Sequence, residues 1–567
     1  MIETKTYCKR SLTFALIIIL GLVILLIIRL GYLMISQSDK YGVLAKEVQE
    51  RERKIKAARG IIFDRNKEII ASNKSVCTIS VIHSQIQDEE KVIDVLVSKL
   101  NMDEETIRKK VTKKSSMEKI KSNVDKNIAD EIRNYDLAGV MVDDDYKRVY
   151  PLNDIASKVI GFTGSDNQGI VGLEVEYDEY LKGKDGIIYT VTTANGIEVE
   201  NKESTRLEPI NGYNLITTID LNIQKYTQQA ARKIYEEKNA KNVKIILMNP
   251  QNGEIYSMVD YPEYNLNEPY EIEVTQEENK TNALNAMWRN ACVSDTYEPG
   301  STFKIVTAIA ALEKGVVKLE DTFNCPGYRI VEDRRIRCHK TTGHGSESFV
   351  EGIMNSCNPV FIDVGERVGI TDMYFYYKKL GLFEKTGIDI PGEASSIMHN
   401  IENVKAVELA TMSFGQSIQI TPLNLLRVAS AAVNGGNLVT PHFAKQVVDD
   451  EGKVIKDFDY KIENNVISQE TSDTMRILLE AVVAEGGGVK GGVEGYRVGG
   501  KTATSQKLPR GNGKYISSFI GFAPADDPEV VVLVIINNPT GIYYGGTIAA
   551  PIAQEIFANI LPYLDKW

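Results

Sequence analysis

The chain has 567 residues, of which 43% are hydrophobic and 25% are charged, and its net charge at pH 7 is −11. This length predicts two or more domains, each with its own buried core. The balance of apolar and charged residues is that of a globular protein, and the negative net charge argues against a nucleic-acid-binding function.

Residues 11–35 are the most apolar part of the chain. The stretch 11–28 carries no charge and is long enough to cross a bilayer as a helix. A cleaved signal peptide would have a shorter apolar core followed by a small-residue cleavage site, which this sequence lacks. Three basic residues precede the span, so the positive-inside rule places residues 1–10 in the cytoplasm. The sequence therefore predicts a single-pass cell-membrane protein whose remaining residues are extracytoplasmic.

The region 36–219 has a mixed pattern and no recognisable chemistry of its own. Its charged beginning, 37–56, predicts a helical stalk, and residues 60–71 predict two strands joined by a polar turn. From 88 to 133, lysines and acids alternate around apolar residues that are spaced for one helix face. We therefore expect an elongated, mixed N-terminal pedestal or dimerisation-like module.

A second domain is predicted over residues 220–567. It opens with an amphipathic helix at 223–238, and apolar strands follow near its start and again near its end. Strands at both ends with helices between them predict an antiparallel sheet flanked by helices, so the protein is a multidomain α+β protein. The strands are predicted at 243–248, 254–259, 519–523 and 530–536.

The strongest chemical signal is a serine followed three residues later by a lysine, Ser301 and Lys304. Proline and glycine precede this pair and Gly315 ends the apolar run that follows, which is the punctuation of a helix. The spacing places the hydroxyl and the amine on one face, where a neutral amine can take the proton of a nucleophile. The same spacing at Ser116 and Lys119 lies in a solvated charged run, so the pattern needs support from other motifs.

Two further motifs lie downstream in a fixed order. The first is a Ser-x-Asn element formed by Ser356 and Asn358. The second is a lysine–threonine element that begins at Lys501 and includes Thr502 and Thr504. A Ser-x-x-Lys, a Ser-x-Asn and a Lys-Thr element in this order resemble the three active-site motifs of penicillin-recognising serine enzymes.

Segments outside these motifs extend the resemblance over nearly the whole chain. The chain resembles the class B, monofunctional penicillin-binding proteins, which are membrane-anchored peptidoglycan D,D-transpeptidases of the elongation, division or spore-cortex type. The segments that carry this resemblance are 59–65 (RGIIFDR), 150–151 (YP), 161–162 (GF), 169–174 (GIVGLE), 290–304, 413–416 (SFGQ), 421–422 (TP), 434–436 (NGG) and 519–524 (FIGFAP).

The resemblance implies an acyl-transfer mechanism that needs no cofactor. Ser301 would attack the penultimate D-alanine carbonyl of a stem pentapeptide and release the terminal D-alanine. Lys304 would be the general base, kept neutral by burial and by positive neighbours such as Lys501. Ser356 would relay the proton to the leaving amine, and Asn358 would orient Lys304 and the substrate amide.

The resemblance also implies how substrates, inhibitors and a partner are bound. Lys501, Thr502 and Thr504 would hold the substrate carboxylate on an edge strand that pairs with the extended peptide. The N–H groups of Ser301 and Thr504 would form the oxyanion hole. An amine from a neighbouring stem would then resolve the acyl-enzyme, and beta-lactams would trap Ser301. The implied protein partner is a SEDS-type glycosyltransferase in the membrane.

The motifs contain two further residues, at positions 503 and 357, that are not among the predicted catalytic or substrate-binding residues. Ala503 stands where the family usually has glycine. On a strand that faces substrate, its methyl group would crowd the ligand or twist the strand, with consequences for beta-lactam affinity. Cys357, inside the Ser-x-Asn element, is interpreted as a packed small residue rather than a reactive one.

Two cysteines and two histidines between the nucleophile and Ser356 predict a structural zinc site, because two thiols and two imidazoles suit tetrahedral Zn²⁺. If neighbouring ligands point in opposite directions, Asp295 or Cys292 could supply the fourth. Such a zinc ion would pin the loop that positions the nucleophile helix. The alternatives are a disulfide between the two cysteines or free thiols with surface histidines. The four predicted ligands are Cys325, Cys338, His339 and His344.

Two other functions compete with a transpeptidase. A D,D-carboxypeptidase or beta-lactamase shares the three motifs, but the N-terminal module and the lack of a recognisable Glu-bearing deacylation loop argue against a hydrolase. A non-catalytic beta-lactam sensor or scaffold would need further membrane spans or a cytoplasmic output domain. The predicted cytoplasmic tail, residues 1–10, leaves no room for such a domain.

Overall fold

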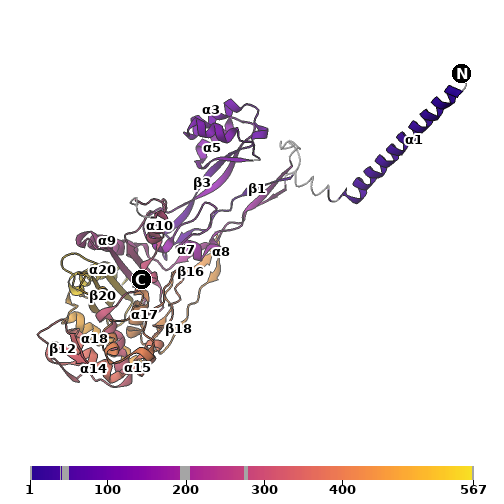
Figure 1. Cartoon of the computed structure of the whole chain (residues 1–567). Coiled ribbons are helices and arrows are strands. Elements are labelled where there is room, and N and C mark those ends of the chain that lie inside the picture. Colours follow the sequence, from indigo (N-terminus) through magenta and orange to yellow (C-terminus); the bar gives the residue numbers. More distant parts are fainter. Residues whose placement is uncertain are drawn as a thin grey trace. The chain divides into compact units, whose positions relative to one another are not determined.

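The computed structural model describes residues 3–38, 40, 50–115, 117–191, 205–273 and 279–564. Ser116, the serine of the second Ser-x-x-Lys match, lies outside them. The chain divides into two compact units, and it passes between them several times (Figure 1). The first unit comprises 1–58, 74–147 and 184–211, and the second comprises 59–73, 148–183 and 212–567.

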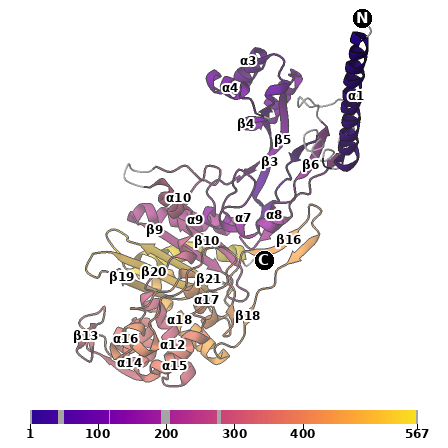
Figure 2. The ribbon, with the colours of Figure 1, turned by 45° about the vertical axis from the view of Figure 1, so that its right-hand side comes forward.

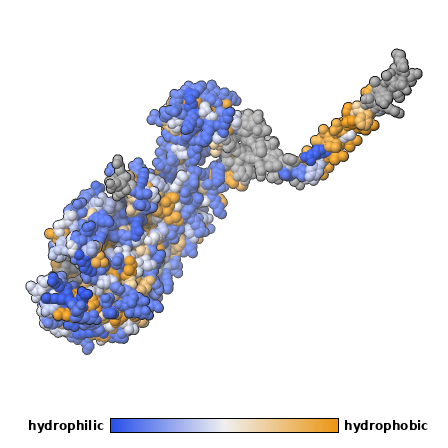
Figure 3. Space-filling model, in the orientation of Figure 1, coloured by the Kyte–Doolittle hydropathy of each residue, from blue (hydrophilic) through white to orange (hydrophobic). Residues whose placement is uncertain are grey.

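The first helix is the candidate membrane span. α1 (Glu3–Gly31) continues into a π-helical turn, η1 (Tyr32–Ser36). Within it, Leu12–Ser36 reaches a mean hydropathy of 3.0 and has no buried residue in its most apolar window. Figure 3 shows this apolar surface in orange. It is the one helix of the described part of the chain that is long and apolar enough to cross a bilayer, which confirms the predicted single N-terminal helix.

The predicted helical stalk at 37–56 is wrong over residues 50–55, whereas Ser38 and Lys40 are helical. Residues 41–49 lie outside the described residues, and β1 (Glu50–Ile55) is a strand that pairs antiparallel with β6 (Gly186–Val191). β7 (Thr205–Leu207) completes this small sheet. Pairing with a segment far along the chain overrides the local helical preference of a charged sequence.

The other part of the first unit contains helices and strands around a separate core. The predicted helical region 88–133 is confirmed except for β4, which pairs antiparallel with β3. Ile120 and Val124 are buried in β4 and lie four residues apart. Buried residues on a helix face have the same spacing, so hydrophobic periodicity could not distinguish this strand from a helix. The elements are β3 (Ile69–Val81), α3 (Glu89–Leu100), α4 (Glu104–Val111), β4 (Glu118–Asp125), α5 (Lys126–Asn134) and β5 (Val140–Val149).

The second unit is built on a five-stranded sheet with the order β10-β9-β21-β20-β19. Every neighbouring pair is antiparallel, which confirms the predicted antiparallel sheet and the predicted strands at both ends of the domain. Figure 2 shows the five strands side by side. They are β9 (Asn242–Met248), β10 (Ile255–Tyr261), β19 (Gly499–Gln506), β20 (Tyr515–Ala523) and β21 (Val530–Asn537).

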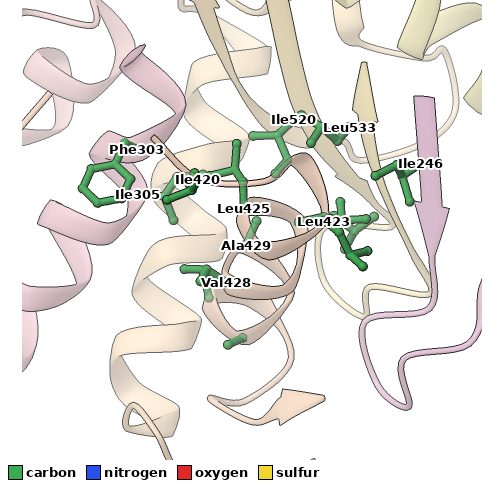
Figure 4. Close-up of a cluster of buried hydrophobic side chains, with 14 of the residues drawn as sticks. Ile246, Phe303, Ile305, Ile420, Leu423, Leu425, Val428, Ala429, Ile520 and Leu533 are labelled. Atoms are coloured by element: carbon green, nitrogen blue, oxygen red, sulfur yellow. The ribbon is translucent and has the colours of Figure 1, made fainter. Parts of the chain in front are cut away.

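Both faces of this sheet are apolar and covered by helices, because successive side chains of a strand point to opposite faces. Ile245 packs in one core with α9 (Leu221–Lys238) and α20 (Ala550–Leu564). Its neighbour Ile246 packs in the other core, with α12 (Lys304–Lys314) and α17 (Pro422–Val433). Figure 4 shows that α17 lies between the strands and Phe303. Ile520 and Leu533 represent the strands, and Phe303 lies beside α12.

The remaining elements include short strands and helices of up to 16 residues. The predicted strand–turn–strand at 60–71 is confirmed by β2 and the start of β3. The strands are β2 (Ile62–Phe63), β8 (Asn214–Thr217), β11 (Thr322–Cys325), β12 (Tyr328–Val331), β13 (Arg334–Arg337), β14 (Gly345–Ser348), β15 (Leu438–Val439), β16 (Ala444–Val448), β17 (Val454–Asp457) and β18 (Ile462–Glu463). The helices are α6 (Ser157–Ile160), α7 (Gly172–Glu176), α8 (Asp178–Leu181), α10 (Lys280–Trp288), α11 (Ala291–Ser294), α13 (Phe349–Met354), α14 (Asn358–Val368), α15 (Ile370–Lys379), α16 (Ala406–Met412), α18 (Gln469–Ala484) and α19 (Gly545–Ile548).

A buried charge cluster joins three of the segments that the sequence analysis singled out. The Glu174 carboxylate on α7 is fully buried and accepts from Arg59 Nε at 2.6 Å and from Arg148 Nε at 2.7 Å. The Tyr150 hydroxyl donates to the same carboxylate at 3.1 Å. Burial opposes the charge of Glu174, but the two guanidinium groups outweigh it and lower the pKa. The cluster therefore ties residues 59, 148–150 and 174 into one charged core.

We predict that Glu174→Gln destabilises the folded protein by about 3–5 kcal/mol, because it leaves two buried guanidinium groups without their shared counter-charge. Thermal unfolding of the full-length protein in detergent would measure the loss. The exposed Glu176 on the same helix provides the control, since Glu176→Gln removes the same charge from the surface. Equal melting temperatures for the two variants would contradict the prediction.

Candidate active site

The candidate nucleophile lies in a tight turn at the start of a buried helix. Ser301 is part of the 3₁₀ turn η3 (Gly300–Phe303), which leads directly into α12. Gly300 has φ +58°, and a Cβ at this position would lie 2.2 Å from the Ser505 hydroxyl oxygen on β19. Only glycine fits both the backbone conformation and this close approach. The turn can therefore place the serine directly beside the edge strand.

Lys304 is buried, with 1% of its surface exposed, and its ammonium is surrounded by oxygen acceptors. Nζ donates to the Ser356 carbonyl at 2.6 Å, to Asn358 Oδ1 at 2.9 Å and to the Ser356 hydroxyl at 3.2 Å. Burial lowers the pKa of Lys304 to about 8, although nearby Cys357 and other acidic groups act in the opposite direction. A share of the amine is therefore neutral close to neutral pH.

The acceptors come from one strained turn between α13 and α14. Ser356 is a non-glycine residue with φ +53°, a conformation that is uncommon outside functional turns. This conformation brings both its carbonyl and its hydroxyl within reach of Lys304. Asn358 is fixed from the other side, because its Nδ2 donates to the Arg337 carbonyl at 3.1 Å.

The lysine–threonine element lies on β19, which is the edge strand of the five-stranded sheet. Lys501 is 1% exposed, and burial, followed by the charge of Lys304, lowers its pKa well below the ordinary value. Its Nζ donates to the Thr502 carbonyl at 3.2 Å. The Thr504 hydroxyl accepts from the Gly545 N–H at 2.9 Å, which fixes the strand against α19.

These groups meet at one cavity of about 700 Å³. Five of the seven residues predicted for catalysis and substrate binding line it. Of the other two, Lys304 donates hydrogen bonds to Ser356 and Asn358, and Lys501 is buried beside Lys304. The five lining residues are Ser301, Ser356, Asn358, Thr502 and Thr504. Motifs that lie 200 residues apart in the chain thus supply a hydroxyl, two amines and an open strand edge to the same space.

The sequence analysis missed an aromatic wall of this cavity. Tyr515 and Tyr543 stack with ring centroids 3.9 Å apart, and Tyr544 lies next to them. All three line the cavity. The tyrosine pair directly before the glycines at 545 and 546 was the available signal, but nothing local connects it to β20.

A group of potential metal ligands lies next to the catalytic turn. Cys325, Cys338, His344 and Cys357 place their ligand atoms within 4.8 Å of one another. Three of these were predicted, but Cys357 takes the place that the prediction gave to His339. His339 is exposed and lines the large cavity; its Nδ1 lies 3.8 Å from Cys338 Sγ, but it is not a member of the four-residue group.

The structure bears on two of the alternatives considered for this group, the other fourth ligands and the disulfide. The Cys292 thiol donates to the Val259 carbonyl, and Asp295 pairs with Arg289 at 2.6 Å. The cysteines of the described residues are free, so the disulfide between Cys325 and Cys338 is absent. Cys357 is fully buried, as expected of a packed residue, but it also belongs to the ligand group.

The group fits a tetrahedral zinc ion by its donor chemistry. Three thiols and one imidazole form a common structural zinc set. The Glu347 carboxylate is 3% exposed, lies 3.7 Å from His344 Nδ1, and has one buried oxygen without a hydrogen-bond partner among the described residues. A carboxylate beside a ligating histidine commonly fixes the orientation of the imidazole.

Comparison with known protein families identifies the chain. Residues 243–558 match the penicillin binding protein transpeptidase domain, and residues 54–217 match the penicillin-binding protein dimerisation domain. Stage V sporulation protein D of Bacillus subtilis is 41% identical over 559 residues, which cover 97% of this chain and 85% of that protein. The chain belongs to the class B penicillin-binding proteins.

Other members of the family agree with this assignment. A probable peptidoglycan D,D-transpeptidase, PenA of Neisseria meningitidis, is 30% identical over 528 residues and is matched over 86% of its length by 91% of this chain. The fold is that of the solved penicillin-binding protein 2X of Streptococcus thermophilus, with a TM-score of 0.76 and 22% identity over 90% of this chain and 80% of that one.

Ala503 stands where penicillin-binding proteins usually have glycine, and the strand accommodates its methyl group. Ala503 is 4% exposed and pairs with Ser518 of β20. The register between β19 and β20 runs without a bulge from Gly499 to Gln506. No bulge therefore accompanies this alanine, and Ala503 is one of the residues that line the cavity.

Proposed function

We propose that this penicillin-binding protein is a peptidoglycan D,D-transpeptidase that cross-links stem peptides through an acyl-enzyme on Ser301. The observation that carries the proposal is the buried Lys304 amine with its lowered pKa, one turn from Ser301 and hydrogen-bonded to Ser356 and Asn358. The name of PenA, a probable peptidoglycan D,D-transpeptidase, supports this reaction, and the name of stage V sporulation protein D is consistent with a role in sporulation.

In the first half of the reaction, the neutral amine of Lys304 takes the hydroxyl proton of Ser301. The oxygen forms a bond to the penultimate D-alanine carbonyl, and the N–H groups of Ser301 and Thr504 hold the oxyanion. The bond to the terminal D-alanine then breaks, and Ser356 relays the proton to the leaving amine. Lys501, Thr502 and Thr504 hold the terminal carboxylate during this step.

In the second half, the amine of a neighbouring stem attacks the ester and gives up a proton to Lys304 through Ser356. The new amide bond forms, the ester bond breaks, and the Ser301 hydroxyl takes back its proton. A hydrolase would use water in place of this amine. The stability of a beta-lactam adduct separates the two, because a transpeptidase keeps it for hours whereas a beta-lactamase releases it in seconds.

We predict that Ser301→Ala abolishes covalent labelling by a fluorescent penicillin, because the acyl-enzyme forms on this hydroxyl, which lines the cavity one turn from the buried Lys304 amine. Mass spectrometry of the labelled full-length protein would locate the adduct. Ser116→Ala is the matched control, since Ser116 belongs to the second Ser-x-x-Lys match and its loss leaves labelling unchanged. Labelling of Ser301→Ala at the wild-type rate would overturn the proposed mechanism.

We predict that the rate of acylation rises with pH up to about 8 and then levels off, because Lys304 has a pKa of about 8 and acts in its neutral form. Below that pH, each unit removes about nine-tenths of the neutral amine. Stopped-flow labelling between pH 6 and pH 9 would measure the profile. A flat profile would exclude Lys304 as the titrating base.

We also propose that Cys325, Cys338, His344 and Cys357 hold a structural Zn²⁺. Cys357 lies between Ser356 and Asn358, so a metal bound there fixes the turn that surrounds the Lys304 amine. The ion supplies no chemistry to acyl transfer and acts by cross-linking β11, the segment after β13 and the start of α14.

Cys357→Ser is expected to lower the zinc content from one ion per chain and to slow acylation, because the catalytic turn loses its anchor. Elemental analysis of the purified protein, with penicillin labelling in parallel, tests this. His339→Ala removes the neighbouring histidine that lies outside the group, and it is expected to keep the zinc. Equal zinc contents in the two variants would contradict the proposed ligand set.

The remaining functional proposals concern location and partners. The division into a cytoplasmic tail at 1–10, an anchor at 11–35, an N-terminal module at 36–219 and a transpeptidase domain at 220–567 stays a prediction. We propose that the catalytic domain is extracytoplasmic, as the basic residues before the apolar span predict. The proposed protein partner is a SEDS-type glycosyltransferase that binds the anchor and the N-terminal module.

A further inference from the structure

A second cavity of about 290 Å³ lies beside the end of β19, and none of the catalytic residues lines it. Three lysines face it: Lys241, Lys244 and Lys507. The two acids that line it already have cationic partners, because Asp295 pairs with an arginine at 2.6 Å and Glu298 pairs with another at 3.1 Å. The cavity is therefore positively charged.

The sheet register places this cavity next to the strand that binds substrate. Its floor is one row of residues that crosses the sheet from β9 to β19, on the face that carries α12. Lys244 belongs to the adjacent row, which ends at Ala503 on β19. The floor residues are Asn242, Asn537, Ile516 and Ser505.

Lys244 is the most unusual of the three lysines. Its side chain is only 7% exposed, and its ammonium makes no hydrogen bond with the described residues. The nearest acidic oxygen, on Asp295, lies 4.0 Å away, and the other oxygen of that carboxylate binds Arg289. Burying an ammonium without a close partner is costly, so an anion in the cavity would stabilise it.

Other groups around the cavity point to the same ligand chemistry. The Lys507 ammonium donates to Asn537 Oδ1 at 3.1 Å. Burial, and then the charges of Lys241 and Lys244, lower the pKa of Lys507, because these two cations repel its ammonium. The Tyr297 hydroxyl is buried beside them and has no hydrogen-bond partner among the described residues. An anion would relieve the repulsion and could accept from several donors at once.

The direction of the bound peptide follows from the proposed function, on which this inference rests. If Lys501 and Thr502 hold the terminal carboxylate and the scissile carbonyl faces the Thr504 N–H, the upstream residues continue toward Lys507. Three residues of extended chain span about 10 Å, which is enough to bring an upstream side chain to the cavity.

We propose that this cavity binds a carboxylate of the donor peptide that lies upstream of its D-alanyl-D-alanine end. Lys244 and Lys507 hold the carboxylate, and Tyr297 borders the site. These two lysines then select donors by charge, at a place that beta-lactams without an upstream carboxylate do not reach. They are specificity-determining residues, and they take no part in the bond-breaking steps.

The test compares two synthetic donor peptides in the full-length protein, one with a free upstream carboxylate and one with that group converted to a carboxamide. Wild-type protein is expected to use the carboxylate donor with a kcat/KM about tenfold higher, the value of one charge-assisted hydrogen bond. Lys244→Met and Lys507→Met each remove this preference and leave the carboxamide donor unchanged. Lys385→Met, which removes an exposed lysine outside the cavity, keeps the preference.

Penicillin labelling separates this inference from the proposed function. Variants that label normally but lose the charge preference support the site, whereas loss of labelling in wild-type protein would defeat the function itself. Equal use of both donors by wild-type protein would overturn the proposed site. A third outcome would also overturn the proposed site. If inorganic phosphate inhibits the use of both donors equally, and Lys244→Met abolishes that inhibition, the cavity binds a free anion instead.

Discussion

The active site depends on one buried ammonium group. Lys304 is removed from water on α12, and three acceptor contacts with Ser356 and Asn358 hold its amine. Burial favours the neutral form of the amine, while the acceptors keep the amine in place. A lysine in water would be both charged and mobile, so neither condition for a general base would be met.

The layers around α12 provide this burial. α17 lies between the sheet and the nucleophile helix, and its side chains fill the space between strand residues such as Ile246 and the aromatic ring of Phe303 (Figure 4). On the other side, glycine at position 300 lets β19 approach the nucleophile turn closely. Close packing thus holds the edge strand against the nucleophile turn, and hydrogen bonds to Ser356 and Asn358 hold the lysine.

The Cys/His group and the catalytic turn share the same backbone. Cys357 is flanked by Ser356 and Asn358, and Asn358 also donates to the carbonyl that precedes Cys338. Any cross-link through the thiols therefore constrains the acceptors of Lys304. This arrangement explains why a structural ion could influence a reaction in which it takes no part.

The sequence by itself determined the apolar helix at the N-terminus, the antiparallel strands at both ends of the second domain and the order of the three catalytic motifs, because each is a local pattern of side chains. Only the tertiary structure decided that 50–55 is a strand, that Cys357 rather than His339 completes the Cys/His group, and that Lys244 faces a cavity at the end of β19. These features arise where distant segments meet, and spacing along the chain does not encode which segments will pair.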